Sequence, residues 1–63
     1  MKIKETERLT GIPAANIRYY EKEGLLKPGR NKENNYREYS EEDVLRLKQI
    51  KVLRLLGITL DEI

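Results

Sequence analysis

The sequence contains no cysteine and no histidine, and these absences limit its chemistry. Without cysteine it forms neither a disulfide nor a thiolate metal site, and without histidine it lacks the most common zinc ligand and general base. No apolar run approaches the roughly 20 residues that cross a bilayer, and the start of the chain has no signal-peptide pattern. The sequence therefore predicts a cytoplasmic module without membrane, metal or cofactor, and we expect that it is not an enzyme.

Phenylalanine and tryptophan are also missing, so four tyrosines are the only aromatic residues. They lie in two groups that each include an arginine: Arg18, Tyr19 and Tyr20, then Tyr36, Arg37 and Tyr39. Tyrosine hydroxyls and arginines bind phosphate oxygens, and 13 basic and 11 acidic residues give a net charge of +2. On charge alone a solvated, salt-bridged surface is favoured, with a polyanion partner as the alternative. We expect one or two tyrosines in the core.

The first half of the chain predicts two short helices. Its 63 residues suffice for one domain, and residues 4–9 and 13–22 have helical character. Between them, Gly11 suits the left-handed conformation that ends a helix, and Pro13 suits the first helical position of the next one. Two helices joined by a tight turn that contains glycine predict a helix-turn-helix.

Residues 25–39 predict a β-hairpin, or wing. The apolar pair Leu25 and Leu26 can pair as a strand with residues 36–39. Asn34 and Asn35 precede the second strand, and asparagine tolerates the positive φ of a tight turn. The tip of this hairpin would carry three basic residues, which are Arg30, Lys32 and Arg37.

A third helix is predicted to begin after Ser40. This residue is an N-cap with Asp43 three positions later, and acidic residues in a first turn suit the helix dipole. Gly57 ends the helix. The core stripe recurs at helical spacing and consists of Val44, Leu47, Ile50, Leu53 and Leu56. Arg46, Lys51 and Arg54 lie off this stripe.

Residues 58–63 carry a second helix start signal. Thr59 and Glu62 form a T-x-x-E capping pattern, but the chain stops within the first turn. Because a one-turn helix is costly to nucleate, we expect a further helix that is cut off here. The alternative is a natural end in which Leu60 and Ile63 only cover the core.

In this order, the elements resemble the DNA-binding domain of the MerR family of bacterial transcription regulators. The resemblance runs from Ile3 to Ile63, nearly the whole chain. It rests on residues 10–12 (TGI), 17–21 (IRYYE), 23–26 (EGLL), Pro28, Arg30, 36–37 (YR), 39–40 (YS), 54–60 (RLLGITL) and 62–63 (EI). The resemblance implies a mainly α fold with a small β-hairpin, a winged helix-turn-helix over residues 1–57.

The resemblance also implies roles for individual residues. Residues 13–22 would be the recognition helix in the major groove, where Arg18 and Asn16 can bond bases or phosphates and alanines can meet thymine methyls. Phosphate contacts would come from the wing, helix three and tyrosine hydroxyls. The full set of expected DNA contacts is Ala15, Asn16, Arg18, Tyr19, Tyr20, Arg30, Tyr36, Arg37 and Arg54. The alternatives are that Tyr20 is purely a core residue, that Arg54 is solvated, and that Arg18 pairs with Glu21 along the helix. Glu21 is expected to orient a nearby arginine.

Three positions depart from the family pattern. Thr6 and Glu7 stand where an aliphatic and a small residue are usual, so we expect looser packing of the first helix and a Glu7 side chain tilted toward solvent. Pro13 replaces a serine cap, which leaves an N–H of the second helix to water. Asn35 replaces a glycine of the wing turn.

For the whole protein, the resemblance implies a homodimer joined by a long helix after this domain. Such a dimer would bind and deform promoter DNA in the cytoplasm, at the nucleoid, and would act on RNA polymerase indirectly. A monomer would read a half-site weakly. The alternatives are a stand-alone excisionase-like or architectural DNA-binding factor, and a protein-interaction module that docks through Leu25 and Leu26 or residues 55–63.

Overall fold

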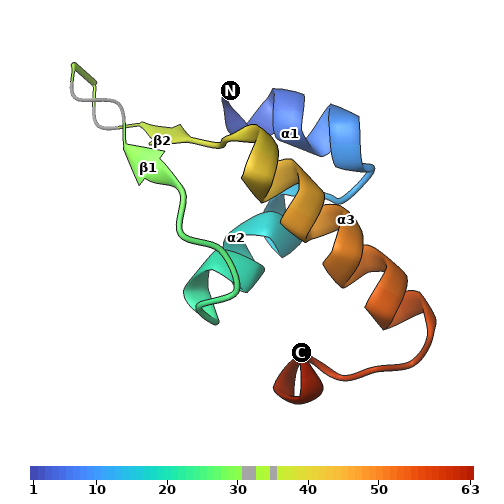
Figure 1. Ribbon diagram of the computed structural model, residues 1–63. Coiled ribbons are helices and arrows are strands. Elements are labelled where there is room, and N and C mark those ends of the chain that lie inside the picture. Colours follow the sequence, from blue (N-terminus) through green and yellow to red (C-terminus); the bar gives the residue numbers. More distant parts are fainter. Residues whose placement is uncertain (31–32, 35) are drawn as a thin grey trace.

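The computed structural model describes residues 1–30, 33–34 and 36–63, except for the side chain of residue 30 (Figure 1). The described part forms three α-helices, one two-stranded hairpin and a short 3-10 turn. In chain order these are α1 (Ile3–Thr10), α2 (Ala14–Lys22), β1 (Gly29–Arg30), β2 (Arg37–Glu38), α3 (Glu41–Leu55) and the turn Leu60–Glu62. The predicted mainly α fold with one hairpin is confirmed.

The turn between α1 and α2 is held by polar contacts. Gly11 has a φ of 71° and donates its N–H to the carbonyl of Glu7 at 2.8 Å. The Thr10 hydroxyl donates to the carbonyl of Thr6 at 2.8 Å and accepts from the N–H of Ile12 at 3.2 Å. Pro13 is the N-cap of α2 and not its first helical residue, which corrects the predicted start by one position.

Thr6 packs more tightly than the sequence suggested. Its side chain is fully buried, and its hydroxyl donates to the carbonyl of Lys2 at 3.1 Å. Because the hydroxyl is satisfied within its own helix, the polar residue is accommodated in the interior. The expected loosening of α1 at this position is therefore not found.

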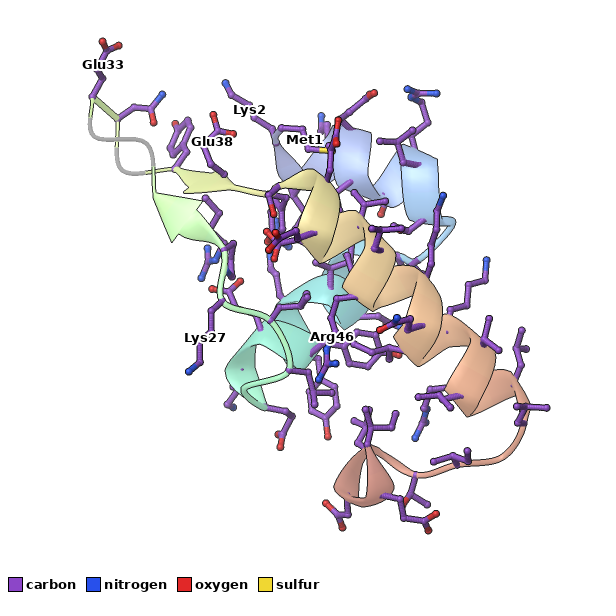
Figure 2. The ribbon with its side chains drawn as sticks, in the orientation of Figure 1. Met1, Lys2, Lys27, Glu33, Glu38 and Arg46 are labelled. Carbon is purple, nitrogen blue, oxygen red and sulfur yellow. The ribbon has the colours of Figure 1, made fainter. Side chains whose placement is uncertain are left out.

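The hairpin is antiparallel, with Gly29 opposite Glu38 and Arg30 opposite Arg37. The predicted pairing of Leu25 and Leu26 with the second strand is wrong. Leu26 is only 3% exposed and belongs to the core, so the chain reaches the sheet only after Pro28. Arg46 of α3 holds the connection that precedes the sheet (Figure 2), because its Nε donates to the carbonyl of Leu25 at 3.4 Å.

One apolar cluster holds the three helices and the base of the wing together. It consists of Ile12, Ile17, Tyr20, Leu26, Tyr39, Leu47 and Ile50. Tyr20 and Tyr39 are buried, whereas Tyr19 and Tyr36 are exposed, as expected for two of the four tyrosines. The N-terminal residue Met1 closes one edge: its ammonium donates to the carbonyl of Tyr39 at 2.8 Å, and its carbonyl accepts from the N–H of Tyr39 at 2.7 Å.

The start of α3 has the predicted cap. The Ser40 hydroxyl accepts from the N–H of Asp43 at 3.1 Å, and the Asp43 carboxylate accepts from the N–H of Ser40 at 2.8 Å. Val44, Leu47 and Ile50 are buried as predicted, but Leu56 is 72% exposed. The stripe continues past the point where the shorter α1 and α2 can cover it, so its last position faces solvent.

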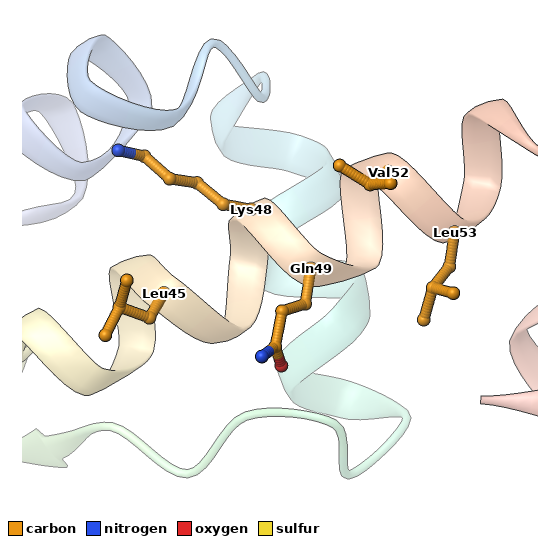
Figure 3. Close-up of a pocket in the computed structure, with 5 residues that line it drawn as sticks. All are labelled: Leu45, Lys48, Gln49, Val52 and Leu53. Atoms are coloured by element: carbon orange, nitrogen blue, oxygen red, sulfur yellow. The ribbon is translucent and has the colours of Figure 1, made fainter.

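The outer face of α3 is apolar. Leu45 and Val52 are 61% and 55% exposed, and they line a shallow groove together with Lys48, Gln49 and Leu53 (Figure 3). The spacing of three and four residues places this groove on the side of α3 that faces away from the core. None of the described helices is long and apolar enough to cross a membrane.

After α3 the chain bends at Gly57 and ends in the 3-10 turn. Thr59 occupies the predicted N-cap position, but its side chain makes no capping bond, so the T-x-x-E box is not formed. Leu60 and Ile63 are half-buried and pack against the core cluster.

Candidate nucleic-acid interface

The second helix presents one side to solvent. Ile17 and Tyr20 face the core, and 3.6 residues per turn place the exposed residues on the opposite side. That exposed side carries Ala15, Arg18, Tyr19 and Lys22. Among the described residues, Arg18 forms no ion pair, so the expected alternative of a pair between Arg18 and Glu21 is not found.

An ion pair joins α2 to the wing. Nε of Arg37 lies 2.8 Å from Oε1 and 2.7 Å from Oε2 of Glu21. The hydroxyl of Tyr39 donates to the same carboxylate at 3.5 Å. Glu21 therefore orients an arginine, as predicted, and its partner comes from β2. The hydrogen bond to Glu21 raises the pKa of the Arg37 guanidinium, and burial, followed by the charge of Glu21, raises the pKa of Tyr39.

A shallow cleft lies along the other side of α2, where the helix approaches the end of α3. It has a volume of about 340 Å³ and is lined by Asn16 and Tyr20 of α2 and by Lys51 and Arg54 of α3, among others. Nζ of Lys51 donates to the carbonyl of Thr10 at 3.2 Å. The cleft brings Arg54 next to α2, although it lies 38 residues after Asn16 in the sequence.

The outer part of the wing adds further polar groups. Tyr36 is 62% exposed, and Nζ of Lys2 lies 5.6 Å from the centre of its ring. The N–H of Tyr36 donates to Oδ1 of Asn34 at 3.0 Å. Three sequence-based predictions fall outside the described part of the chain. They concern the phosphate contact of the Arg30 side chain, the tip residue Lys32 and the turn residue Asn35.

The structure thus groups several of the predicted contacts around α2. Ala15, Arg18 and Tyr19 lie on its exposed face, Arg37 of the wing bonds Glu21, and Arg54 of α3 lines a cleft with Asn16. Tyr20 fits less well, because its ring is only 8% exposed and belongs to the core cluster.

Three lysines at this surface were not among the predicted contacts. Lys22 lies on the open side of α2, Lys51 lines the cleft, and Lys27 extends away from the body beside the connection to β1 (Figure 2). Lys22 could have been found from the sequence, since it follows Arg18 by four residues and so shares its helix face. The place of Lys51 depends on how α3 crosses the end of α1.

Glu7 has a role that the sequence did not indicate. It is half-buried, and its Oε2 accepts from the N–H of Ala14 at 2.5 Å. The expectation that this carboxylate tilts toward solvent is therefore wrong. The expectation that an N–H of the second helix relies on water stays a prediction, because Glu7 accepts from Ala14 and the described bonds include none from the N–H of Ala15. The described residues contain no cluster of acidic side chains that could hold a metal ion.

Known proteins resemble the chain over its whole length. A family model for the MerR HTH family regulatory protein matches residues 1–63. The HTH-type transcriptional regulator AdhR of Bacillus subtilis (strain 168) is 36% identical over 61 residues, which are 97% of this chain and 44% of that protein. CueR of Escherichia coli O157:H7 is 34% identical over 62 residues, which are 98% of this chain and 46% of that protein.

A solved structure agrees with these relatives. The transcription regulator PbrR691 from Ralstonia metallidurans CH34, crystallised in complex with lead(II), superposes with a TM-score of 0.87 and 36% identity. The match covers 97% of this chain and 48% of that one. This chain therefore spans less than half the length of each of the three proteins. All three are named as regulators of transcription and not as enzymes, in agreement with the sequence-based expectation.

Proposed function

The chain belongs to the MerR family of helix-turn-helix regulatory proteins, and from this premise we propose that it reads double-stranded promoter DNA for a bacterial transcription regulator. In this proposal α2 enters the major groove, which is wide enough for one α-helix. The wing and the end of α3 contact the phosphates on the two sides of that groove.

The observation that carries the proposal is the flanking of α2 by two arginines. Arg37 bonds α2 from the wing and Arg54 approaches it from α3, while the exposed face of the helix carries Arg18, which forms no ion pair within the described part of the chain. A groove presents base edges in its floor and a phosphate backbone on each rim. The spatial order of these three arginines supports Arg18 as the base reader and the outer two as phosphate contacts.

The remaining predicted contacts take supporting roles. Asn16 lies beside the cleft and can bond a base edge or a phosphate, Ala15 and Tyr19 face the groove, and Tyr36 offers its hydroxyl to the backbone. Arg30 is proposed as a further phosphate contact. Tyr20 can contribute only its hydroxyl, because its ring is buried.

For the protein as a whole, we propose a homodimer that acts at promoter DNA in the cytoplasm and affects RNA polymerase through the deformation of that DNA. The relatives are about twice as long as this chain, so there is room in them for a dimerisation segment after residues 58–63. The apolar groove on α3 supports assembly, because exposed apolar patches mark interaction sites. We propose that the dimerisation segment of the second copy covers it.

The test is a DNA titration at several salt concentrations. A duplex selected from a random library by the protein serves as the probe. Three arginines on phosphates, which are Arg30, Arg37 and Arg54, predict that log K falls with log salt with a slope of about −3. A flat dependence would overturn DNA binding and would favour the protein-interaction module instead.

A further inference from the structure

The recognition helix begins without a cap of its own. Pro13 occupies the N-cap position, and this residue has no side-chain acceptor for the N–H groups of the first turn. Helix N-termini leave four such groups unbonded, and serine, threonine, aspartate or asparagine normally accepts from one of them. The first turn of α2 therefore depends on an acceptor from elsewhere in the chain.

That acceptor is Glu7, seven residues earlier in the sequence. Its Oε2 lies 2.5 Å from the N–H nitrogen of Ala14, the first residue of α2. A carboxylate at this place also interacts favourably with the positive end of the helix dipole. Within the described part of the chain, the helix has no other side-chain acceptor at its start.

The same residue also ends the preceding helix. The backbone carbonyl of Glu7 accepts the N–H of Gly11 at 2.8 Å, and Gly11 adopts the left-handed conformation that turns the chain. Glu7 is thus bonded on both sides of the turn, once through its backbone and once through its side chain. Together with the bonds of the Thr10 hydroxyl, these two bonds of Glu7 set the direction in which α2 leaves α1.

We propose that Glu7 is a positioning residue for DNA recognition, which caps the recognition helix from the neighbouring helix. This inference rests on the proposed function, because it concerns how α2 is presented to DNA. Asn16 and Arg18 lie within the first five residues of α2, so an unbonded or frayed first turn displaces them directly. Hydrogen bonds to base edges weaken steeply with misalignment, so such a displacement lowers affinity for the selected site.

The test is a double-mutant cycle with a replacement cap. Glu7→Ala removes the acceptor of the Ala14 N–H, and Pro13→Ser supplies a cap for the next N–H groups of the same first turn, at an N-cap whose ψ of 145° is already extended. The four proteins of the cycle are compared in two measurements: the dissociation constant for the selected duplex and hydrogen exchange of the Ala14, Ala15 and Asn16 amides. Glu5→Ala is the matched control, since it removes one negative charge from the same helix without touching α2.

Glu7→Ala is expected to weaken binding to the selected duplex roughly three- to tenfold and to speed exchange at the start of α2. Adding Pro13→Ser should restore most of both losses, whereas Pro13→Ser alone and Glu5→Ala should change affinity by less than about twofold. If Glu7→Ala does not fold at all, recovery of folding and binding in the double variant supports the inference equally.

Two results would overturn it. One is unchanged binding and exchange in Glu7→Ala, and the other is a double variant that stays as weak as Glu7→Ala. Failure of the wild-type protein to bind any duplex would refute the proposed function instead. In that case the exchange measurements alone still decide whether Glu7 caps α2.

Discussion

Arg18 and Arg37 are held in different ways, and this difference sets what each can do on DNA. Arg37 is fixed by the carboxylate of Glu21, which occupies its Nε. Arg18 stands on the open face of α2 without an ion-pair partner in the described part of the chain. A guanidinium with all donors available can make the bidentate bond to guanine that specifies sequence.

Substitution of each arginine by alanine is therefore expected to change DNA binding in a different way. Arg18→Ala should relax the preference at one base position and cost about 1–3 kcal/mol on the selected site only. Arg37→Ala should weaken all duplexes alike and reduce the salt slope by about 1. Titrations of the selected duplex and a scrambled one measure both effects. Equal and uniform losses in the two variants would refute the assignment of Arg18 as a base reader.

Tyr39 should make the protein sensitive to alkaline pH. Burial, reinforced by the charge of Glu21, raises the pKa of its hydroxyl in the folded state. The stability that comes from the neutral hydroxyl is present below the ordinary pKa of about 10 and is lost as pH rises through the raised value. The free energy of unfolding in urea should therefore fall above about pH 10.

Substitution of single tyrosines isolates this effect. Tyr39→Phe should remove most of the alkaline decline, and Tyr19→Phe, which changes an exposed ring, should leave it in place. Urea unfolding of the three proteins across the alkaline range provides the measurement. Identical declines in both variants would show that Tyr39 is not the group responsible.

Among the elements, those fixed by neighbouring residues were predictable from the sequence. The capping box of α3 depends on Ser40 and Asp43, three residues apart, and the end of α1 depends on the backbone of Gly11. Both were predicted, because each follows from residue type and spacing alone. The two short helices and the wing also emerged from such local signals and from the family resemblance.

Features that depend on distant partners were not predictable in the same way. Leu26 joins the core and not a strand because its side chain belongs to a cluster with residues that lie both before and after it in the sequence. Leu56 is exposed because the covering helices are shorter than α3. Glu7 was expected to tilt toward solvent. Its partner is a backbone N–H in the next helix, and the sequence does not indicate which backbone group a side chain will bond.

The turn between α1 and α2 should tolerate no side chain at Gly11. Its φ of 71° is unfavourable for other residues, whereas the atom that an added Cβ would meet, Nζ of Lys51 at 2.9 Å, is the end of a flexible side chain that can move aside. Gly11→Ala is expected to lower the free energy of unfolding by about 1–2 kcal/mol. Gly29→Ala is the control, because that position has no positive φ and no atom within 4 Å of the new Cβ. Similar urea midpoints for the two variants would contradict this view of the turn.

The proposed function gives the molecule two working faces. One carries α2 with the arginines on its two sides, and the other is the apolar groove on the outer side of α3. Under the proposed function, the first face would hold DNA and the groove would hold a second copy.

Two joined copies should consequently bind far more tightly than one. A tandem of two chains with a flexible glycine and serine linker turns the second contact into an intramolecular one. On a palindromic duplex of two selected sites, its affinity should exceed that of the single chain by about 10²–10⁴-fold, provided that the linker spans both sites. Equal affinities for the palindrome and for a duplex with one site would show that the two copies do not bind together.

The ion pair between Glu21 and Arg37 has a consequence for attempts to change sequence preference by grafting. It couples α2 to the wing, so a foreign α2 without an acid at position 21 would leave Arg37 without this partner, and a foreign wing without a cation at position 37 would leave Glu21 without it. The smallest unit that can be exchanged between relatives is therefore the continuous block from Ala14 to Glu38, taken together. A chimaera in which α2 alone is exchanged would carry new base contacts but would lose the ion pair that joins this helix to the wing.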